Sequence, residues 1–224
     1  MDMVGRMEPR HNRFLPEEQL AKEMTISRAT LREAMASLIR DGFVTPRHGS
    51  GNYGHPSAVK MPHRIDLCGD FIQLSDAGGQ SVEVTCQSSG FTEAPAVMKR
   101  YYPVPCDEVY ELHWVYRSDG RPTVLSRIYI PKELIIGEPA PSQENGREKL
   151  AGWIRRCCGR DFAYYSTYLS CNVDADACRM LELPEDTPMQ NWRQVTYDLF
   201  DEPVAFCDNY FHPDNIELSI VMRP

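Results

Sequence analysis

The sequence lacks any hydrophobic run long enough to cross a membrane as a helix, which takes about 18 or more apolar residues. Its first residues, MDMVGRMEPRHNRF, are polar and contain no apolar stretch of signal-peptide length. These two absences argue against a membrane-spanning helix and against export. We therefore expect a soluble, cytoplasmic protein that has no membrane partner.

The sequence also lacks the ligand spacings of a metal centre. A structural zinc site usually contains a close pair such as Cys-x2-Cys. Here Cys157 and Cys158 are adjacent, and Cys171 and Cys178 lie seven residues apart with no histidine nearby. The eight cysteines suit disulfides only in an oxidising compartment, for which no export signal is present. We predict free thiols, no metal site and no cofactor.

Signatures of catalysis are missing as well. The sequence contains no Ser-His-Asp arrangement, no phosphate-binding P-loop and no dinucleotide fingerprint. Acidic groups such as Glu182 with Glu185 and Asp186 lie in a polar turn, where charged side chains are usually only solvated. We therefore predict that the protein is not an enzyme.

What the sequence does contain is an uneven distribution of charge. The net charge is −8, yet residues 1–60 hold nine Lys and Arg against seven Asp and Glu. The acidic excess therefore belongs to residues 61–224. A polyanionic partner such as DNA would bind at the N-terminal segment rather than at the acidic body.

The N-terminal segment has the pattern of two helices followed by a hairpin. LPEEQLAKEM (residues 15–24) predicts a short helix, and SRATLREAMASLIR (27–40) predicts a second one with apolar residues at helical spacing. Ser27 suits its N-cap, and Gly42 suits a left-handed C-terminal stop. The following FVTPRHGSGNYG (43–54) predicts two short strands around a glycine-rich turn, the form of a β-wing.

The polar face of the second helix is positioned to contact DNA. In helix-turn-helix proteins the N-terminal end of this helix enters the major groove, where arginine pairs with guanine and hydroxyl side chains contact phosphates or bases. Arg47 and His48 at the wing tip could reach a phosphate or the minor groove. A single surface arginine would mean little, but the ordered combination of helices, stop and wing favours DNA binding.

This segment resembles a known family. ISRATLREAMASLIRDGFVTPRHGSG resembles the winged helix-turn-helix of GntR-type bacterial transcription regulators, over about residues 14–54. The resemblance implies that the helix start contacts bases and phosphates and that the wing contacts the backbone. The predicted DNA-binding residues are Ser27, Arg28, Ala29, Thr30, Arg32, Arg47, His48, Gly49 and Ser50.

Two departures from that family leave an alternative open. Glu18 stands where the family usually has an arginine, and a carboxylate there would repel phosphate. The family also has a further helix upstream, whereas only poorly periodic residues precede Leu15. The alternative is a metabolite-binding protein whose head does not bind DNA.

The body of the chain contains a weak internal repeat at an offset of 81 residues, between about 82–129 and 163–210. Each copy has the pattern of a strand, a short helix, a proline-containing turn and two further strands. Between the copies, REKLAGWIRRCCG (147–159) has helical spacing. The body therefore predicts an α+β fold with a mainly antiparallel sheet.

The body resembles a second family. VYELHWVYRSDGRPTVLSRIYIP and WRQVTYDLFDEPVAFCDNYFHPDN resemble the UTRA effector-binding domain of the HutC branch of GntR regulators, over about residues 67–222. The resemblance implies a fold similar to that of chorismate lyase. It also implies a small-metabolite effector bound by strands of the repeat, which changes the spacing of the two DNA-binding heads of a dimer.

The expected effector pocket differs from that of many UTRA domains. They carry two arginines at the positions of Trp114 and Tyr116, and a glutamate at that of Ser126. Aromatic rings cannot pair with an anion as arginine does, so we expect a less anionic ligand with a ring or apolar part that stacks on them. The open alternative is that both rings belong to the core. The predicted effector-binding residues are Trp114, Tyr116, Ser126, Tyr129, Asp208 and Tyr210, with Arg100 or Arg127 as a further source of charge.

These observations predict an α+β chain in three parts. A winged helix-turn-helix DNA-binding domain over residues 1–55 is followed by a linker over 56–65 and by a UTRA-like ligand-binding domain over 66–224. We expect a transcription repressor that binds double-stranded operator DNA as a homodimer. A small-molecule effector in the C-terminal domain would modulate that binding.

Overall fold

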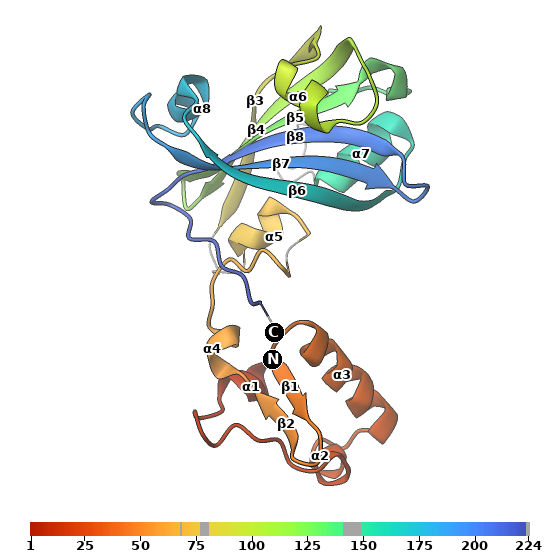
Figure 1. Ribbon diagram of the computed structural model, residues 1–224, viewed down its shortest axis with the longest axis vertical. Coiled ribbons are helices and arrows are strands. Elements are labelled where there is room, and N and C mark those ends of the chain that lie inside the picture. Colours follow the sequence, from red (N-terminus) through yellow and green to blue (C-terminus); the bar gives the residue numbers. More distant parts are fainter. Residues whose placement is uncertain (68, 77–80, 141–148, 223–224) are drawn as a thin grey trace. The chain divides into compact units, whose positions relative to one another are not determined.

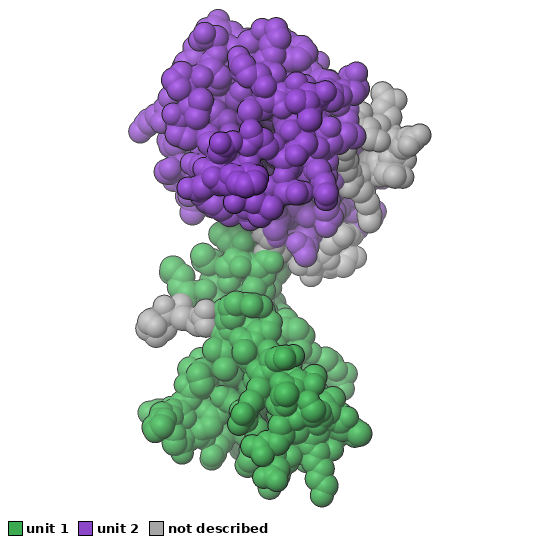
Figure 2. Space-filling model, turned by 90° about the vertical axis from the view of Figure 1, so that its right-hand side faces the viewer, with its two compact units in different colours: residues 1–68, 218–224 green, residues 69–217 purple. Residues whose placement is uncertain are grey.

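The computed structural model describes residues 1–67, 69–76, 81–140 and 149–222. The chain forms two compact units, coloured separately in Figure 2. Unit 1 comprises residues 1–68 together with 218–224, and unit 2 comprises residues 69–217. Among the described residues, no helix is both long enough and apolar enough to span a membrane.

Unit 1 is a small helical domain with a two-stranded sheet (Figure 1). Its strands pair antiparallel, with Arg47 opposite Gly51 beside the turn, as predicted for the wing. Apolar side chains from the helices and from the first strand form one core cluster. The elements are α1 (Asp2–Gly5), α2 (Glu17–Glu23), α3 (Arg28–Arg40), β1 (Val44–Arg47), β2 (Gly51–Gly54) and α4 (Pro56–Val59).

The two ends of α3 are fixed by the residues that the sequence indicates. The Ser27 hydroxyl accepts a hydrogen bond of 3.0 Å from the backbone N–H of Thr30, which satisfies one of the free donors at the helix start. At the other end Gly42 has a φ of +76°, a left-handed conformation that costs glycine little. The predicted N-cap and stop are both confirmed.

A short helix lies upstream of α2, although the sequence pattern does not reveal it. It is α1, only four residues long, and its Val4 is 1% exposed in the same core cluster as Leu20 and Leu31. A helix this short has no room for an apolar repeat, so periodicity cannot detect it. The segment expected as a linker, residues 56–65, contains α4 and the buried side chain of Arg64.

Unit 2 is built around a six-stranded antiparallel sheet in the order β3-β4-β5-β8-β7-β6. This order confirms the predicted repeat, because each half contributes three consecutive strands and the last strands of the two halves pair at the centre. The predicted α+β fold with an antiparallel sheet is confirmed. The strands are β3 (Val82–Glu93), β4 (Glu108–Ser118), β5 (Arg121–Pro131), β6 (Phe162–Asn172), β7 (Met189–Asp198) and β8 (Pro203–Phe211).

Helices cover both faces of this sheet, and Figure 1 shows α6 and α8 on the side opposite α5. On one face, hereafter the α5/α7 face, Trp153 packs on Trp114 at 5.8 Å and Phe71 packs on Tyr116 at 5.5 Å. On the other, the α6/α8 face, each helix packs against a separate apolar cluster. The helices are α5 (Phe71–Asp76), α6 (Ala96–Tyr101), α7 (Leu150–Cys158) and α8 (Ala175–Met180), with the short 3₁₀ turn η1 at Lys132–Leu134.

Candidate functional site

The first candidate site is the N-terminal end of α3. Arg28, Ala29, Thr30 and Arg32 are all exposed there. The first turn contains no acidic residue, so the positive end of the helix dipole and its free N–H groups are open to an anion. The α3 surface therefore presents two guanidinium groups and a hydroxyl around a helix end that favours phosphate.

One of these arginines is already paired within the protein. The Arg32 Nε donates to Glu17 Oε2 at 2.8 Å, from α3 to the start of α2. Both side chains are solvent-exposed, at 63% and 36%, so the pair contributes little to stability. It does hold the Glu17 carboxylate beside the surface predicted to meet phosphate, in addition to the Glu18 carboxylate that the family resemblance indicates.

The wing lies between β1 and β2. Arg47, His48 and Gly49 at its turn are exposed, and Gly49 has a φ of +70°. The Ser50 hydroxyl is hydrogen-bonded to the Tyr53 hydroxyl at 2.5 Å, so Ser50 stabilises the wing.

Arg13 is a further exposed cation beside this wing and is not among the predicted DNA-binding residues. Its backbone forms a bridge with Tyr53, and its guanidinium lies close to Gly51. Because Arg13 lies in an irregular segment, no sequence pattern signals its position.

The predicted effector residues do not lie together. Opposite residues in paired strands share a face, and alternate residues along a strand point to opposite faces. Trp114 is opposite Ser126, which places both with Tyr116 on the α5/α7 face. The remaining three, Tyr129, Asp208 and Tyr210, point to the α6/α8 face.

The expected single pocket that contains all six residues is therefore wrong. Trp114 is 3% exposed and Tyr116 is 4% exposed, and both pack against aromatic rings of the helices that cover their face. Ser126 is also buried and donates to Asn209 Oδ1 at 2.6 Å. The core interpretation of the two aromatic residues, which the sequence left open, fits this structure.

A polar cluster occupies the centre of the α6/α8 face, where the two halves of the repeat meet. Strand pairing places Arg127 opposite both His113 and Asp208, and Asp208 opposite Arg193. Each half thus supplies four residues at equivalent positions of the strand pairing. The polar cluster comprises Glu111, His113, Arg127 and Tyr129 from the first half and Asn191, Arg193, Asp208 and Tyr210 from the second, with Asp174 beside them.

Asp174 links this cluster to α8. It is the N-cap of that helix and accepts from the Ala177 N–H at 2.8 Å. Its two oxygens accept from Arg127 Nη1 and Nη2 at 2.9 and 3.0 Å, a bidentate pair. The hydrogen bond from Arg127 and its positive charge hold the pKa of Asp174 below its usual value.

The other charged groups of the cluster are also paired internally. Asp208 accepts from Asn191 Nδ2 at 2.7 Å and from the Tyr210 hydroxyl at 3.1 Å, and Arg193 lies 3.4 Å away. Glu111 is hydrogen-bonded to His113 Nε2 at 2.8 Å, which lowers the pKa of Glu111. The cluster holds three carboxylates against two guanidinium groups and so has no large positive excess.

Several polar atoms of this face nevertheless lack a partner. Six buried side-chain nitrogen or oxygen atoms have no hydrogen-bond partner among the described residues, and four of them lie on the α6/α8 face. An unsatisfied buried polar group costs free energy, so these atoms favour a polar partner such as an ordered water or a polar ligand. The four atoms are His113 Nδ1, Arg127 Nε, Ser166 Oγ and Arg193 Nε.

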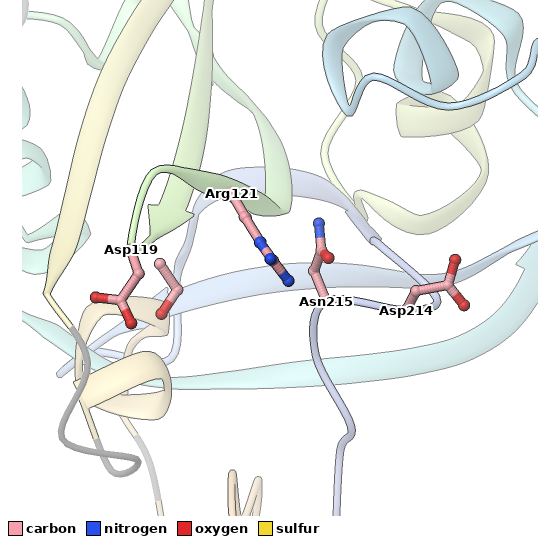
Figure 3. Close-up of a pocket in the computed structure, with 5 residues that line it drawn as sticks. Asp119, Arg121, Asp214 and Asn215 are labelled. Carbon is pink, nitrogen blue, oxygen red and sulfur yellow. The ribbon is translucent and has the colours of Figure 1, made fainter.

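A surface pocket of about 310 Å³ lies elsewhere on unit 2 (Figure 3). Asp119, Arg121, Asp214 and Asn215 line it, between the β4–β5 turn and the residues after β8. Asp119 and Asn215 are already hydrogen-bonded to backbone groups at 3.1 and 2.8 Å. This pocket is therefore a weaker candidate than the polar cluster.

Removal of the Ser27 hydroxyl tests how α3 is held. We expect Ser27→Ala to lower the free energy of unfolding of unit 1 by about 1 kcal/mol, because the Thr30 N–H loses its acceptor. Hydrogen exchange of the first turn of α3 measures this loss. Ser57→Ala in α4, where no side-chain cap is present, is the control and should leave α3 unchanged. If the amides of this turn exchange at the same rate in the wild type, Ser27→Ala and Ser57→Ala, the capping role of Ser27 is contradicted.

Two protein families match this chain, one over each unit. The family described as "UTRA domain" matches residues 80–217, and the family described as "Bacterial regulatory proteins, gntR family" matches residues 4–53. The first match covers more than half of the chain. Both families consist of transcription regulators or their effector domains, not of enzymes.

Individual relatives align with most of the chain. An HTH-type transcriptional regulator of Rhizobium meliloti is 24% identical over 211 residues, which cover 92% of this chain and 84% of the relative. Among solved structures, PhnF from Mycobacterium smegmatis has a TM-score of 0.58 at 21% identity, over 99% of this chain and 96% of its own. YydK from Bacillus subtilis has a TM-score of 0.73 at 14% identity, over 95% and 90%. At these identities the structural likeness concerns the fold alone.

Proposed function

The chain belongs to the UTRA-domain family and combines its effector domain with a gntR-type DNA-binding domain, and from this premise we propose how it works. The protein is a repressor that binds operator DNA as a homodimer. A small-molecule effector binds at the polar cluster of unit 2 and weakens DNA binding. One observation supports the DNA-binding part most strongly. The start of α3 is exposed, has no acidic residue in its first turn, and carries Arg28 and Arg32.

A homodimer follows from how such heads read DNA. One α3 helix covers only one half-site, and two copies related by a two-fold axis read a pseudo-palindromic operator about one helical turn apart. The well-packed core of unit 1, including α1, supports an intact head rather than a degenerate one. Binding of the promoter region upstream of its own gene, measured against random DNA of equal length, tests this proposal.

The polar cluster indicates what kind of effector it binds. Its carboxylates have donors within the protein, whereas Arg127 Nε and the Ser166 hydroxyl beside the cluster have no hydrogen-bond partner and can both donate. Arg193 Nε, a third donor, has only its 3.4 Å ion-pair contact with Asp208. The effector should therefore present hydrogen-bond acceptors. Because both guanidinium groups already face carboxylates, a doubly charged phosphate would meet little uncompensated positive charge. We propose an uncharged or singly charged polar molecule, such as a small hydroxy- or amino-carboxylate.

A thermal-shift panel tests this ligand class. Small carboxylates and sugar phosphates are compared at equal concentration, and we expect stabilisation by a carboxylate, about 2.7 kcal/mol at a hundred times its Kd. Arg193→Ala should abolish that shift, whereas Arg179→Ala, an exposed arginine on α8, should retain it. Stabilisation by a sugar phosphate that survives Arg193→Ala would contradict the proposal.

The Glu17–Arg32 pair predicts a gain of DNA affinity. Glu17→Gln frees Arg32 and removes a negative charge near phosphate, so we expect about two- to five-fold tighter operator binding at low salt. Fluorescence anisotropy with labelled duplex measures this change. Glu185→Gln, an exposed carboxylate of unit 2, removes the same charge far along the chain and should have no effect. Weaker binding by Glu17→Gln would show that Glu17 positions Arg32 for contact.

A further inference from the structure

Two segments that are distant in the sequence meet on unit 1. Residues 62–66 follow α4, and residues 218–222, hereafter the tail, follow unit 2 in the chain. The Ile65 N–H donates to the Ser219 carbonyl at 3.0 Å, and the Ser219 N–H donates to the His63 carbonyl at 3.1 Å. The Ser219 hydroxyl also donates to the Pro62 carbonyl. The tail is thus hydrogen-bonded to the segment that leaves the head.

Arg64 joins this pair of segments to the end of α3. Its side chain is 4% exposed, and its Nη2 donates to the carbonyl of Asp41 at 2.8 Å. Asp41 is the C-cap of α3, so Arg64 satisfies one of the free carbonyls of that helix. The guanidinium also lies 4.6 Å from the centre of the Phe43 ring and forms an ion pair with Asp66.

The tail contributes its own contact at the same place. Gly42 directly follows the C-cap of α3, and a Cβ on this glycine would lie 3.1 Å from Val221 Cγ1. The tail therefore packs against the left-handed turn that ends α3. Because Val221 lies so close to Gly42, a shift of the tail would change the packing around this turn.

A buried arginine needs a reason, because removing a charge from water is costly. The contacts of Arg64 offset this cost only in part, because its Nη1 has no hydrogen-bond partner among the described residues. Burial would raise the pKa of Asp66, but the hydrogen bond and charge of Arg64 outweigh burial and lower it. Apolar packing would hold a static joint at lower cost, whereas the buried guanidinium, with its directed bonds to Asp41 and Asp66, fixes one particular arrangement of the segments it joins.

The chain passes between the two units twice, near residue 68 and near residue 217. Both passages adjoin Arg64. The first contains its ion-pair partner Asp66, and the second continues into the tail, which is hydrogen-bonded to the residues on either side of Arg64. The second passage begins with β8, which carries Asp208 and Tyr210 of the polar cluster. Any effector-dependent movement of either connection therefore reaches the residues around the end of α3.

We propose that Arg64 is a positioning residue that fastens both connections to the end of α3 and so makes the orientation of this helix depend on unit 2. This inference rests on the proposed function, because it assumes that α3 reads DNA and that unit 2 binds an effector. Arg64 touches neither partner. Its role is to couple the two units, not to bind either ligand.

Hydrogen exchange of the full chain without any ligand gives the first test. In Arg64→Ala, the amides of Ile65 and Ser219 should exchange about tenfold faster or more, because the two segments come apart. The amide of Leu31, in the first part of α3, should not change. Arg121→Ala, an exposed arginine of unit 2, is the matched control. Unchanged protection of Ser219 in Arg64→Ala would overturn the proposal.

The second test measures coupling through tryptophan emission. All three tryptophans, Trp114, Trp153 and Trp192, lie in unit 2, so their emission reports on that unit alone. Binding of the promoter duplex should change this emission in the wild-type protein, because coupling between two sites is reciprocal. Ser219→Pro removes the tail's N–H donor and leaves Arg64 in place. It should bind the duplex within about twofold of wild type but lose most of the emission change.

The outcomes separate this inference from the proposed function. If the wild-type protein does not bind the duplex in preference to random DNA, the proposed function fails, and hydrogen exchange alone then decides whether Arg64 holds the segments. If the wild-type protein binds and Ser219→Pro retains the full emission change, the coupling role of these contacts is wrong. An absent emission change in the bound wild-type protein would also contradict it.

Discussion

Replacement of Arg28 by alanine is expected to weaken operator binding by about 5- to 150-fold, equivalent to about 1–3 kcal/mol. Arg28 is the first residue of α3 and is exposed beside a helix start that contains no acidic side chain. An arginine here can form two parallel hydrogen bonds to guanine, and alanine offers no donor in its place. The loss should therefore be larger for operator DNA than for random DNA.

Arg40 provides the matched control for this substitution. It lies on the same helix and is also exposed, but it is in the last turn, where it pairs with Asp41. Arg40→Ala should change operator affinity by less than about twofold, because that end of a recognition helix points away from the bases. Equal losses in the two variants would mean that α3 acts only through its total charge, and base reading by Arg28 would be refuted.

Replacement of Arg127 by alanine is expected to lower the free energy of unfolding of unit 2 by about 3 kcal/mol at pH 7. Arg127 lies at the centre of the repeat and is 11% exposed, and its bidentate partner Asp174 caps α8. Without Arg127, the carboxylates of Asp174 and Asp208 remain close together with less compensating charge. Urea unfolding monitored by tryptophan emission measures the change.

The effect of this substitution should depend on pH in a defined direction. The native pKa of Asp174 is lowered chiefly by the hydrogen bond from Arg127, so the pair stabilises the fold above the ordinary pKa of an aspartate. That stabilisation is lost as the pH falls through the lowered native pKa. The difference between wild type and Arg127→Ala should therefore shrink below about pH 4.

A paired substitution distinguishes the ion pair from simple packing. Arg127→Met with Asp174→Asn removes both charges, keeps most of the volume and keeps an oxygen that can cap α8. It should be more stable than Arg127→Ala, because the Asp174 carboxylate no longer stands beside Asp208 without its cation. A double variant as unstable as the single one would show that the cost comes from lost packing. Loss of effector response in a folded double variant is expected, since Arg127 belongs to the polar cluster.

Much of this architecture could be predicted because local signals and tertiary structure agree. The apolar spacing of α3, the Ser27 cap and the Gly42 stop are all local features, and the structure confirms each of them. The repeat at an offset of 81 residues predicted two equivalent halves, and the symmetric strand order confirms them. The short helix α1 was not predicted, because four residues cannot show a helical period.

The candidate effector site could be predicted only in part. Tyr129, Asp208 and Tyr210 lie in the polar cluster, whereas Trp114, Tyr116 and Ser126 lie on the opposite face. Resemblance placed both groups in one pocket, but neighbouring strand positions that differ by one residue point to opposite faces.

The pairing that places Trp114 opposite Ser126 joins two strands, and no local pattern in the sequence reveals this register. Arg193 and Asp174 join the polar cluster only through cross-strand pairing and a helix cap. Their place in the site therefore depends on tertiary structure that no local pattern in the sequence predicts.

Operator binding across a salt series tests the central claim most directly. The full-length protein is titrated into the labelled promoter duplex from its own gene, with random DNA of equal length as competitor. If two heads each place Arg28, Arg32 and Arg47 near phosphates, the slope of log K against log salt should be roughly −5. Preference for the promoter duplex with such a slope is the predicted result. Equal affinity for both DNAs, or none for either, would contradict the account.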